Sequence, residues 1–501
     1  MSLAKLFSRA LNGMEAPQII VEVHVASGLP SFSIVGLPDT EIKESRDRIR
    51  SAIQNSGFDF PARRITVNLA PADLPKDSSR YDLPIALGIV LASGLCNTQF
   101  KLDDFEFAGE LALDGELRPI KGALAMAYGI DRSSRQFILP ISNANEASLI
   151  ENLHVTGAQS LTQVIEFLSG KISLPRSNTS TNSLNLDEII FEQDFKQVKG
   201  QISSKKALEI AAAGRHSILM IGNPGCGKSM LANRISSILP NLSPTQAISS
   251  ASLHSLSTQG FKLENWCKVP FRAPHHTTSA IALVGGGSNP KPGEISLAHN
   301  GVLFLDELPE FDRKVLEVMR EPLEAKKISI ARAKNKVEYL ADFQLIAAMN
   351  PCPCGHLGHP QKTCSCSIEQ INRYRAKISG PLLDRIDIVV EVPTLNPNEL
   401  QDLASGESSK QIRERVILAR KTQLNRQGKL NYELTNDEVE QHCKLDEAAN
   451  NLLQQIVLKQ GLSARGYYRQ LKLARTIADL AQSKIITVAH IGLANQYKRN
   501  L

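Results

Sequence analysis

The segment His216–Ser229 reads HSILMIGNPGCGKS and carries residues whose types and spacing suit phosphate binding. The loop Gly222–Ser229 fits G-x-x-x-x-G-K-[ST], between a short apolar run at Ile218–Ile221 and a helical pattern over Met230–Ile238. In such a loop, backbone N–H groups face the phosphates, the lysine reaches the β- and γ-phosphates, and the final hydroxyl ligates Mg²⁺. We therefore predict an ATP site formed by Gly222, Asn223, Pro224, Gly225, Cys226, Gly227, Lys228 and Ser229.

Two later apolar runs end in polar residues that serve the same chemistry. The first, GVLFL, ends in Asp306 and Glu307, and the second, Phe343–Met349, ends in Asn350. Ligands of open α/β sheets bind at the carboxyl ends of parallel strands. We expect Asp306 to hold Mg²⁺ together with Ser229, Glu307 to polarise the attacking water, and Asn350 to sense the γ-phosphate. The alternative for the two acids is a strand followed by an acidic helix cap.

One arginine lies directly before a predicted strand at Ile388–Val392. It is Arg385, in the run GPLLDRID. This arginine resembles the finger that AAA+ rings insert into the neighbouring subunit's site, where it stabilises charge on the transferring phosphoryl group. The alternative is a surface ion pair with Asp384 or Asp387.

A second arginine opens a predicted C-terminal helix. Arg469 begins the run RQLKLARTIADL, which has helical apolar spacing. An arginine at the start of this lid helix resembles the second sensor arginine of related ATPases. Arg465 and Arg475 remain alternatives for that role.

Two insertions carry cationic and hydrogen-bonding residues on predicted loops. One is the stretch FRAPHHTTS, and the other is a hairpin predicted over Glu324–Tyr339. The family resemblance described at the end of this section implies a motor on DNA, and a motor that moves along any DNA sequence must hold the phosphate backbone, because phosphates are present at every step. We expect the contacts to come from Arg272, His275, His276, Thr277, Lys334 and Lys336. The alternative is a pair of solvated basic loops without a binding role.

Four cysteines follow Asn350 within one loop. Cys352 and Cys354 form one C-x-C pair, and Cys364 and Cys366 form another, with two histidines between them. Four thiolates on one loop are sufficient for a tetrahedral Zn²⁺ site. The alternative is four reduced cysteines in a loop rich in glycine and proline.

Length and composition set limits on the whole protein. At 501 residues, the chain is long enough for about three domains. The net charge of +6 permits a polyanionic partner without requiring one. The apolar run Leu83–Cys96 is too short to span a bilayer, and the first residues lack the apolar core of a secretory signal. We expect a cytoplasmic protein without a membrane segment, and eight cysteines that stay reduced or bind metal.

The chain divides by pattern into four parts. Residues 1–172 alternate strand and helix patterns: strands are predicted at Ile19–Val25 and Ile65–Leu69, a helix over Asp39–Ser56, and a hairpin turning at Asp114-Gly115. Residues 173–190, rich in Ser, Asn and Thr, form a predicted linker. Residues 191–393 form the ATPase core, and residues 394–501 a helical lid.

The first domain resembles the peptidase domain of Lon-type proteases. The shared features are the run PKD, where a nucleophilic serine follows in the proteases, and a hairpin reading GE…GE…PI. Asp82 falls near the place of the serine, and Leu124 falls where the catalytic lysine would be. A serine–lysine dyad needs a hydroxyl beside an amine. The resemblance therefore implies a Lon-peptidase-like α+β fold without peptidase activity, used for assembly or for nucleic-acid contact.

From end to end the chain resembles the ComM/YifB family of magnesium-chelatase-like AAA+ ATPases. The motifs that carry the resemblance are SRALNG, GLPD, RYDLP, the phosphate loop, APHHT, LFLDELPEF, NPCPCG, GPLLDRID and YRQLKLARTIADL. The resemblance implies an α/β protein with the Lon-like domain first, a central AAA+ P-loop domain and a C-terminal helical lid. It further implies a homohexameric, ATP- and Mg²⁺-dependent DNA helicase. Such an enzyme promotes branch migration on single-stranded and branched DNA in homologous recombination and natural transformation, alongside recombination proteins.

Two other functions fit parts of the sequence. One is a chelatase-type ATPase that remodels a protein or metal-insertion partner. Such an enzyme normally relies on an integrin-like domain, and the sequence shows none. The other is an ATP-dependent protease, against which the missing dyad argues. DNA-stimulated ATPase activity would favour the helicase, and degradation of casein would favour the protease.

Overall fold

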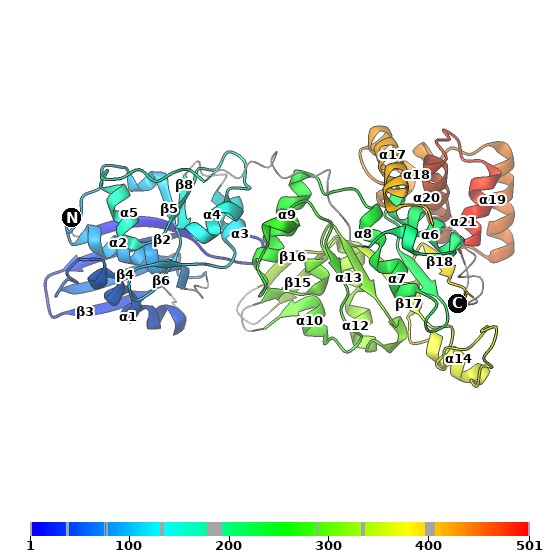
Figure 1. Cartoon of the computed structure of the whole chain (residues 1–501), viewed down its shortest axis with the longest axis horizontal. Helices are drawn as coiled ribbons and strands as arrows, with labels where there is room; N and C mark the ends of the chain where they lie inside the picture. The colour runs from blue at the N-terminus through cyan, green and yellow to red at the C-terminus, as the bar shows by residue number, and fades with distance from the viewer. Residues whose placement is uncertain are drawn as a thin grey trace.

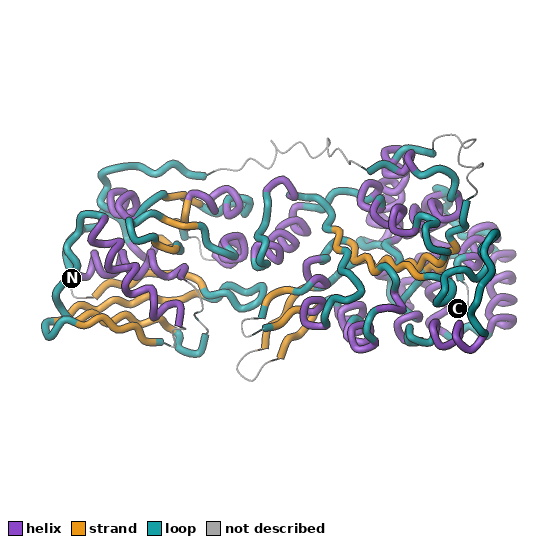
Figure 2. The backbone as a smooth tube through the Cα atoms, turned by 60° about the horizontal axis from the view of Figure 1, so that its bottom comes forward, coloured by secondary structure: helices purple, strands orange, loops and turns teal. Residues whose placement is uncertain are grey.

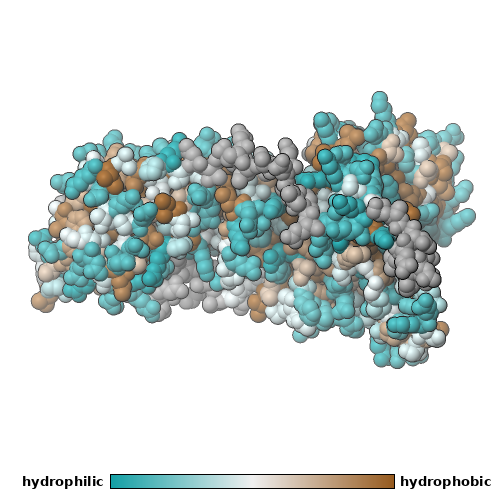
Figure 3. Space-filling view, viewed as in Figure 1, coloured by the Kyte–Doolittle hydropathy of each residue, from teal (hydrophilic) through white to brown (hydrophobic). Residues whose placement is uncertain are grey.

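The computed structural model describes residues 3–36, 40–74, 76, 79–130, 135–177, 193–287, 290–331, 336–395 and 406–498. The N-terminal domain lies at one end of an elongated molecule, the ATPase core in the middle and most of the lid helices at the other end (Figure 1). On the face seen in Figure 3, hydrophilic side chains predominate and apolar ones are scattered. Among the described residues, no helix is both long and apolar enough to cross a membrane.

The N-terminal domain begins with a four-stranded sheet in the order β1-β2-β4-β3. Its elements are β1 (Leu3–Arg9), β2 (Gln18–Ala26), β3 (Ser31–Val35), β4 (Arg64–Ala70), α1 (Thr40–Asn55) and α2 (Asp82–Ala92). Every second residue of β2, beginning at Ile19, is buried, as the alternating pattern predicts. Helix α2 is apolar on all sides because it packs against the sheet and against α1.

A second, parallel sheet completes this domain in the order β5-β8-β9. The strands of this sheet are β5 (Phe105–Phe107), β8 (Gln136–Pro140) and β9 (Val155–Ala158). The same half of the domain contains β6 (Glu110–Leu111), β7 (Leu117–Arg118), α3 (Ala123–Ile130), α4 (Ile141–Ala147) and α5 (Leu161–Leu168). Strands β6 and β7 form the hairpin predicted to turn at Asp114-Gly115. The strands and the helix predicted from sequence are therefore confirmed, whereas the likeness to a Lon-type peptidase fold stays a prediction.

The positions assigned to the peptidase dyad are filled by buried side chains. Asp82 is almost fully buried, and its Oδ2 accepts from Arg48 Nε at 3.1 Å. Burial raises the pKa of the Asp82 carboxyl to about 7, although the Arg48 guanidinium opposes the shift. Leu124 lies on helix α3 and is fully buried in an apolar cluster. Asp82 and Leu124 are therefore part of the packed interior of this domain.

The N-terminal domain extends beyond the boundary predicted at residue 172. Arg176 forms a bridge with Thr156, and the Ser177 N–H donates to the Val155 carbonyl at 2.9 Å. The first residues of the predicted linker therefore belong to this domain. The remainder of the linker, from residue 178, lies outside the described residues.

The ATPase core is built on a five-stranded parallel sheet in the order β11-β14-β17-β10-β18. Its strands are β10 (Ile218–Ile221), β11 (Phe271–Arg272), β14 (Val302–Leu305), β17 (Gln344–Met349) and β18 (Ile388–Glu391). Neighbouring residues of a strand face opposite apolar clusters: Ile346 belongs to one and Leu345 to the other. Burial on both faces explains why these strands read as continuous apolar runs.

Helices cover both faces of this sheet. One face carries α6 (Ile202–Gly214), α8 (Ile235–Ile238), α17 (Ser409–Gln427), α20 (Ala464–Leu480) and α21 (Val488–Gln496). The other carries α10 (Ala280–Val284), α11 (Glu294–Leu297), α12 (Arg313–Val318), α13 (Arg320–Ala325) and α15 (Gly380–Leu383). The helix predicted after the phosphate loop begins at Lys228 and is divided into α7 (Lys228–Asn233) and α8. The lid thus shares its core with the sheet.

The lid is helical, as predicted. Two further helices complete it, α18 (Asn436–His442) and α19 (Glu447–Gln460). The predicted start of α20 at Arg469 is wrong. The helix begins at Ala464, because Ser463 caps it by accepting from the Gly466 N–H. Arg469 therefore lies in the second turn.

The predicted hairpin insertion is confirmed as β15 (Lys327–Ala331) and β16 (Lys336–Leu340). Its tip, including Lys334, lies outside the described residues. Figure 2 shows the hairpin between the N-terminal domain and the ATPase sheet. Gly13 of the N-terminal domain approaches it so closely that a Cβ there would lie 2.7 Å from Val337 Cγ1.

The N-terminal domain and the ATPase core share one apolar cluster. Helix α3 packs against α9 (Pro244–Ser255), and Trp266 is buried among residues of both domains. The Gly122 N–H also donates to the Ser255 carbonyl at 3.1 Å. The two domains therefore meet through a packed interface as well as through the linker.

Candidate nucleotide site

The phosphate loop follows β10 directly and has the backbone that its glycines predict. Gly225 and Gly227 have φ angles of +79° and +97°, in the left-handed region that glycine adopts at little cost. A Cβ at Gly222 would overlap the Val392 carbonyl oxygen. These positions accept only glycine without strain.

The predicted lysine and the predicted sensor asparagine lie together. Lys228 Nζ donates to the Asn350 Oδ1 at 3.1 Å and to the Gly222 and Asn223 carbonyls at 2.6 and 3.0 Å. Strand β17, which ends next to Asn350, lies between β10 and β14. The sheet order therefore places Asn350 between the two strands that carry the nucleotide-site residues.

The two predicted magnesium ligands are also neighbours. Ser229 Oγ donates to Asp306 Oδ2 at 2.5 Å. Both residues follow strands of the same parallel sheet, at its carboxyl edge. A hydroxyl and a carboxylate are the hard oxygen ligands that Mg²⁺ prefers beside substrate phosphates.

Glu307 contacts one of the residues predicted to bind DNA. Its φ of 53° is unusual for a residue other than glycine, and its side chain is half exposed. Glu307 Oε2 lies 3.2 Å from His276 Nδ1. Because β11 is parallel to β14, the loop after β11 emerges at the same edge of the sheet as Glu307.

Arg272 does not lie on the loop where it was predicted. It ends strand β11, and its guanidinium makes two bonds to Glu294, from Nε at 2.6 Å and from Nη2 at 2.7 Å. This bidentate pair occupies the group that was expected to meet DNA phosphates. The prediction that Arg272 lies on a loop is wrong, because strand β11 pairs with β14 and Arg272 is the last residue of β11.

The other predicted DNA contacts are described only in part. His275 Nδ1 bonds to Thr277 Oγ1 at 2.9 Å, and both side chains are at the surface. Lys334 lies outside the described residues, and of Lys336 only its place at the start of β16 is described. DNA binding by all six residues stays a prediction.

The predicted arginine finger is paired within its own chain. Arg385 forms an ion pair with Glu324 of α13, and its side chain is 8% exposed. Neither Asp384 nor Asp387 is its partner, so the alternative pairing is wrong. Asp387 instead accepts from His216 at 3.2 Å.

The candidate sensor arginines differ in their surroundings. Arg385, Arg465 and Arg469 line one cavity of about 300 Å³. Arg469 Nη1 donates to the Asp384 and Ile386 carbonyls at 2.8 and 3.0 Å. Arg475, by contrast, is buried against Asp479 at 3.1 Å and has a structural role.

This cavity lies at the edge of the sheet opposite the phosphate loop. Strands β10 and β18 are parallel, with Ile218 opposite Ile388. The phosphate loop follows the last residue of β10, whereas Arg385 precedes the first residue of β18. Arg385 and Arg469 are therefore close to each other but placed away from their own chain's phosphate loop.

Sequence similarity to known proteins extends over the whole chain. The sequence is 47% identical to Competence protein ComM of Haemophilus influenzae, over 99% of this chain and 98% of that protein. It is also 47% identical to the Escherichia coli protein YifB, over 99% of this chain and 97% of that protein. The chain belongs to the ComM/YifB magnesium-chelatase-like family.

Three family models match successive parts of this ComM/YifB chain. Residues 21–143 match "Subunit ChlI of Mg-chelatase", residues 194–400 match "Magnesium chelatase, subunit ChlI", and residues 406–498 match its C-terminal part. An MCM-type protein of Methanocaldococcus jannaschii is 24% identical over 51% of the chain and 30% of its own length. Together with the geometry, the family indicates an ATPase of the AAA+ type that uses nucleotide and Mg²⁺.

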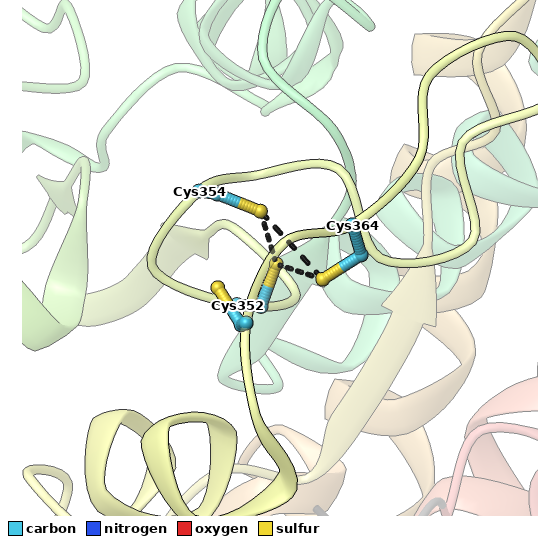
Figure 4. A group of neighbouring side chains, drawn as sticks. Cys352, Cys354 and Cys364 are labelled. Atoms are coloured by element: carbon cyan, nitrogen blue, oxygen red, sulfur yellow. Dashed lines mark hydrogen bonds between the residues drawn. The ribbon is translucent and has the colours of Figure 1, made fainter.

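The four predicted zinc ligands come together in this ComM/YifB chain. Their sulfur atoms all lie within 4.8 Å of one another. Figure 4 shows three of the thiols facing a common point, with S···S distances of 3.4, 3.6 and 3.6 Å. A tetrahedral site with Zn–S bonds of about 2.3 Å has S···S edges of about 3.8 Å. Backbone N–H groups of His356 and Ser365 lower the pKa of the Cys354 thiol to about 5. For Cys364 and Cys366, backbone hydrogen bonds also lower the pKa, but burial and the neighbouring thiols outweigh them and raise it.

Two contacts of the site were not evident from sequence. One joins His276 to Glu307, and the other joins Asn223 of the phosphate loop to the cysteine loop. Asn223 and Gly355 are 132 residues apart, so no local pattern announces their pairing.

Proposed function

We propose that this protein is an ATP-driven, ring-forming DNA translocase that promotes branch migration during homologous recombination, in natural transformation. The observation that carries the proposal is the contact between His276 and Glu307. It connects a segment suited to phosphate-backbone contact with the carboxylate suited to activating water. The same segment would thus report DNA occupancy to the hydrolytic site.

ATP hydrolysis would follow from the groups at the carboxyl edge of the sheet. Lys228 would exchange its carbonyl partners for β- and γ-phosphate oxygens, and Mg²⁺ would be held by Ser229 and Asp306. Glu307 would polarise the attacking water, and Asn350 would orient it. Mg²⁺ neutralises the charge that develops on the phosphoryl group.

A ring is the assembly that this geometry supports. Arg385 and Arg469 lie at the sheet edge opposite their own phosphate loop, and this position supports the proposal that they act on the site of a neighbouring subunit. An arginine that enters the site from another subunit stabilises the transition state only when subunits meet head to tail. Six such contacts would close a homohexamer.

DNA is the substrate that the insertions and the relatives support. The hairpin β15–β16 leads into strand β17 of the nucleotide sheet, the other loop follows strand β11, and both would face a central pore. One relative is named for competence and another is of the MCM type. We propose single-stranded and branched DNA as substrates, recombination proteins as partners, and the cytoplasm as the location.

The remaining parts would support the motor. We propose that the N-terminal domain has a Lon-peptidase-like fold and an assembly role, since buried Asp82 and Leu124 occupy the dyad positions. The four clustered cysteines would bind one structural Zn²⁺.

The test is a branch-migration assay with purified protein and a synthetic four-way junction, alongside ATPase measurements with and without single-stranded DNA. We expect ATP-dependent conversion of the junction and DNA-stimulated hydrolysis, and Lys228→Ala should abolish both. ATPase activity indifferent to DNA, without strand movement, would refute the translocase and favour a chelatase-type remodelling enzyme. Degradation of casein would favour the protease.

A further inference from the structure

The cysteine loop contacts the phosphate loop through a single buried side chain. Asn223 Nδ2 donates to the Gly355 carbonyl at 2.6 Å and to the Leu357 carbonyl at 3.2 Å. Asn223 Oδ1 accepts from Thr394 Oγ1 at 3.2 Å. The asparagine is 7% exposed, so these bonds form inside the molecule, where a lost partner is costly.

The two carbonyls that hold Asn223 are themselves fixed around Cys352. The Leu357 N–H donates to Cys352 Sγ at 3.4 Å, and the Gly355 N–H donates to the Cys352 carbonyl at 3.0 Å. Cys352 is fully buried. The positions of the acceptors therefore depend on where the Cys352 sulfur is held.

Close packing reinforces this contact. Gly355 has a φ of +78°, and a Cβ there would lie 2.6 Å from Pro224 Cγ. The backbone carbonyl oxygen of Asn223 accepts from Lys228 Nζ at 3.0 Å. Two residues thus separate the sulfur cluster from the lysine that would meet the phosphates.

The cysteine loop has little else to hold its shape. Residues 351–367, all of which the structure describes, contain no helix or strand. Only Cys352 and Gly355 are buried among them. A segment with so little buried surface and so few backbone bonds opens readily unless a cross-link or a metal constrains it.

We propose that Cys352, Cys354, Cys364 and Cys366 bind a Zn²⁺ ion whose task is to hold the phosphate loop in its nucleotide-binding shape through Asn223. This inference rests on the proposed nucleotide site and adds that its affinity for nucleotide depends on zinc. With zinc bound, the Gly355 and Leu357 carbonyls are fixed and Asn223 is anchored. Without zinc, the loop loses its shape, Asn223 loses both acceptors, and nucleotide affinity falls.

The first measurement is the zinc content of the full-length protein, purified under reducing conditions and washed with a weak chelator. We expect about one zinc per chain for four thiolate ligands. Replacing Cys354 and Cys366 by serine together should abolish zinc binding. Cys96→Ser, which removes a cysteine outside the cluster, should retain it. Absence of zinc from the intact protein would overturn the proposal.

The second measurement is the affinity for a fluorescent ADP analogue, without DNA. The double cysteine variant should bind about tenfold more weakly, which corresponds to about 1.4 kcal/mol, since the two hydrogen bonds from Asn223 to the cysteine loop are loosened. Asn223→Ala should lose affinity to a similar degree while it keeps its zinc. We call the zinc-dependent contact through Asn223 the clamp. The Asn223→Ala variant therefore distinguishes loss of the clamp from a general loss of folding in the double cysteine variant. Combining all three changes should weaken binding no further than either set alone, because they interrupt one pathway.

The outcomes separate the clamp from the nucleotide site. If the zinc-loaded protein bound no nucleotide, the nucleotide site and the clamp would both be refuted. If it bound nucleotide and lost no affinity on zinc removal or in Asn223→Ala, only the clamp would be refuted. Fully additive losses would also overturn it, because they would show that zinc and Asn223 act independently.

Discussion

His276 Nδ1 lies 3.2 Å from Glu307 Oε2, and this contact joins a residue predicted to touch DNA to one predicted to activate water. The two side chains are 30% and 50% exposed, so both are accessible from solvent. A carboxylate engaged by an imidazole is less available to polarise a water molecule. Movement of His276 toward a phosphate would release Glu307, which links DNA binding to hydrolysis.

Replacing His276 by alanine should uncouple hydrolysis from DNA. With Glu307 released, basal turnover should rise. The DNA-dependent stimulation, typically about 5- to 150-fold between coupled sites, should be lost. His276→Gln, which retains a hydrogen-bond donor, should recover part of it. Steady-state ATPase assays with and without single-stranded DNA measure the ratio. A ratio equal to that of the parent protein would show that the contact has no coupling role.

Glu307→Gln should separate ATP binding from hydrolysis. The amide keeps the size of the side chain but cannot accept a proton from water, so turnover should fall on the order of 10²- to 10⁴-fold. Nucleotide affinity should stay near that of the parent protein, and the ring should be trapped with ATP. Glu310→Gln is the matched control, because Glu310 pairs with Lys377 at 3.3 Å outside the site. Parent-rate turnover in Glu307→Gln would contradict the assignment.

Arg385→Ala should lose hydrolysis while each subunit still binds nucleotide. An arginine finger contributes about 10³- to 10⁵-fold to turnover, and here it would act on the neighbour. Mixing Arg385→Ala with Lys228→Ala subunits should restore some activity, at interfaces that pair an intact phosphate loop with an intact finger. ATPase activity is followed across mixing ratios. Failure of every mixture to exceed both parents would count against action in trans.

Loss of the hairpin lysines should weaken the grip on DNA. Lys334→Ala combined with Lys336→Ala should keep basal ATPase activity but lose DNA stimulation and unwinding. The slope of log affinity against log salt should flatten by about one unit for each lost phosphate contact. Lys327→Ala is the matched control, since Lys327 pairs with Glu338 at 3.0 Å in the same hairpin. An unchanged salt slope with normal unwinding would remove these lysines from the DNA site.

The buried Asp82 carboxyl predicts a pH dependence of N-terminal domain stability. Its pKa is about 7 in the folded domain, against an ordinary value of 3.8. The folded state therefore binds more protons between these values, and stability falls as pH rises through that window, by on the order of 4 kcal/mol in total. Asp82→Asn should flatten the dependence, whereas Asp103→Asn, at an exposed position, should not. Protection factors of α2 amides, measured by hydrogen exchange at pH 5 and pH 8, test this. Equal dependence in all three proteins would contradict it.

The sequence by itself determined the elements of the nucleotide site. Apolar runs that end in Gly222, Asp306 and Asn350 are read locally, since strand formation and the glycine loop depend on near neighbours. Parallel pairing then brings strand ends to one edge of a sheet, so the meeting of Ser229, Asp306 and Lys228 with Asn350 was predictable. The clustering of the four cysteines was also predictable from sequence, because all four lie within one short loop.

Only the tertiary structure decided which side chains meet across long separations. Strand β11 has two residues, too few to give a sequence pattern, yet its pairing with β14 places Arg272 in the sheet and His276 on Glu307. Arg385 pairs with Glu324, 61 residues away, in preference to the adjacent aspartates. Such partners depend on how helices and loops pack around the sheet. Packing is set by contacts across the whole chain and leaves no local periodicity to read.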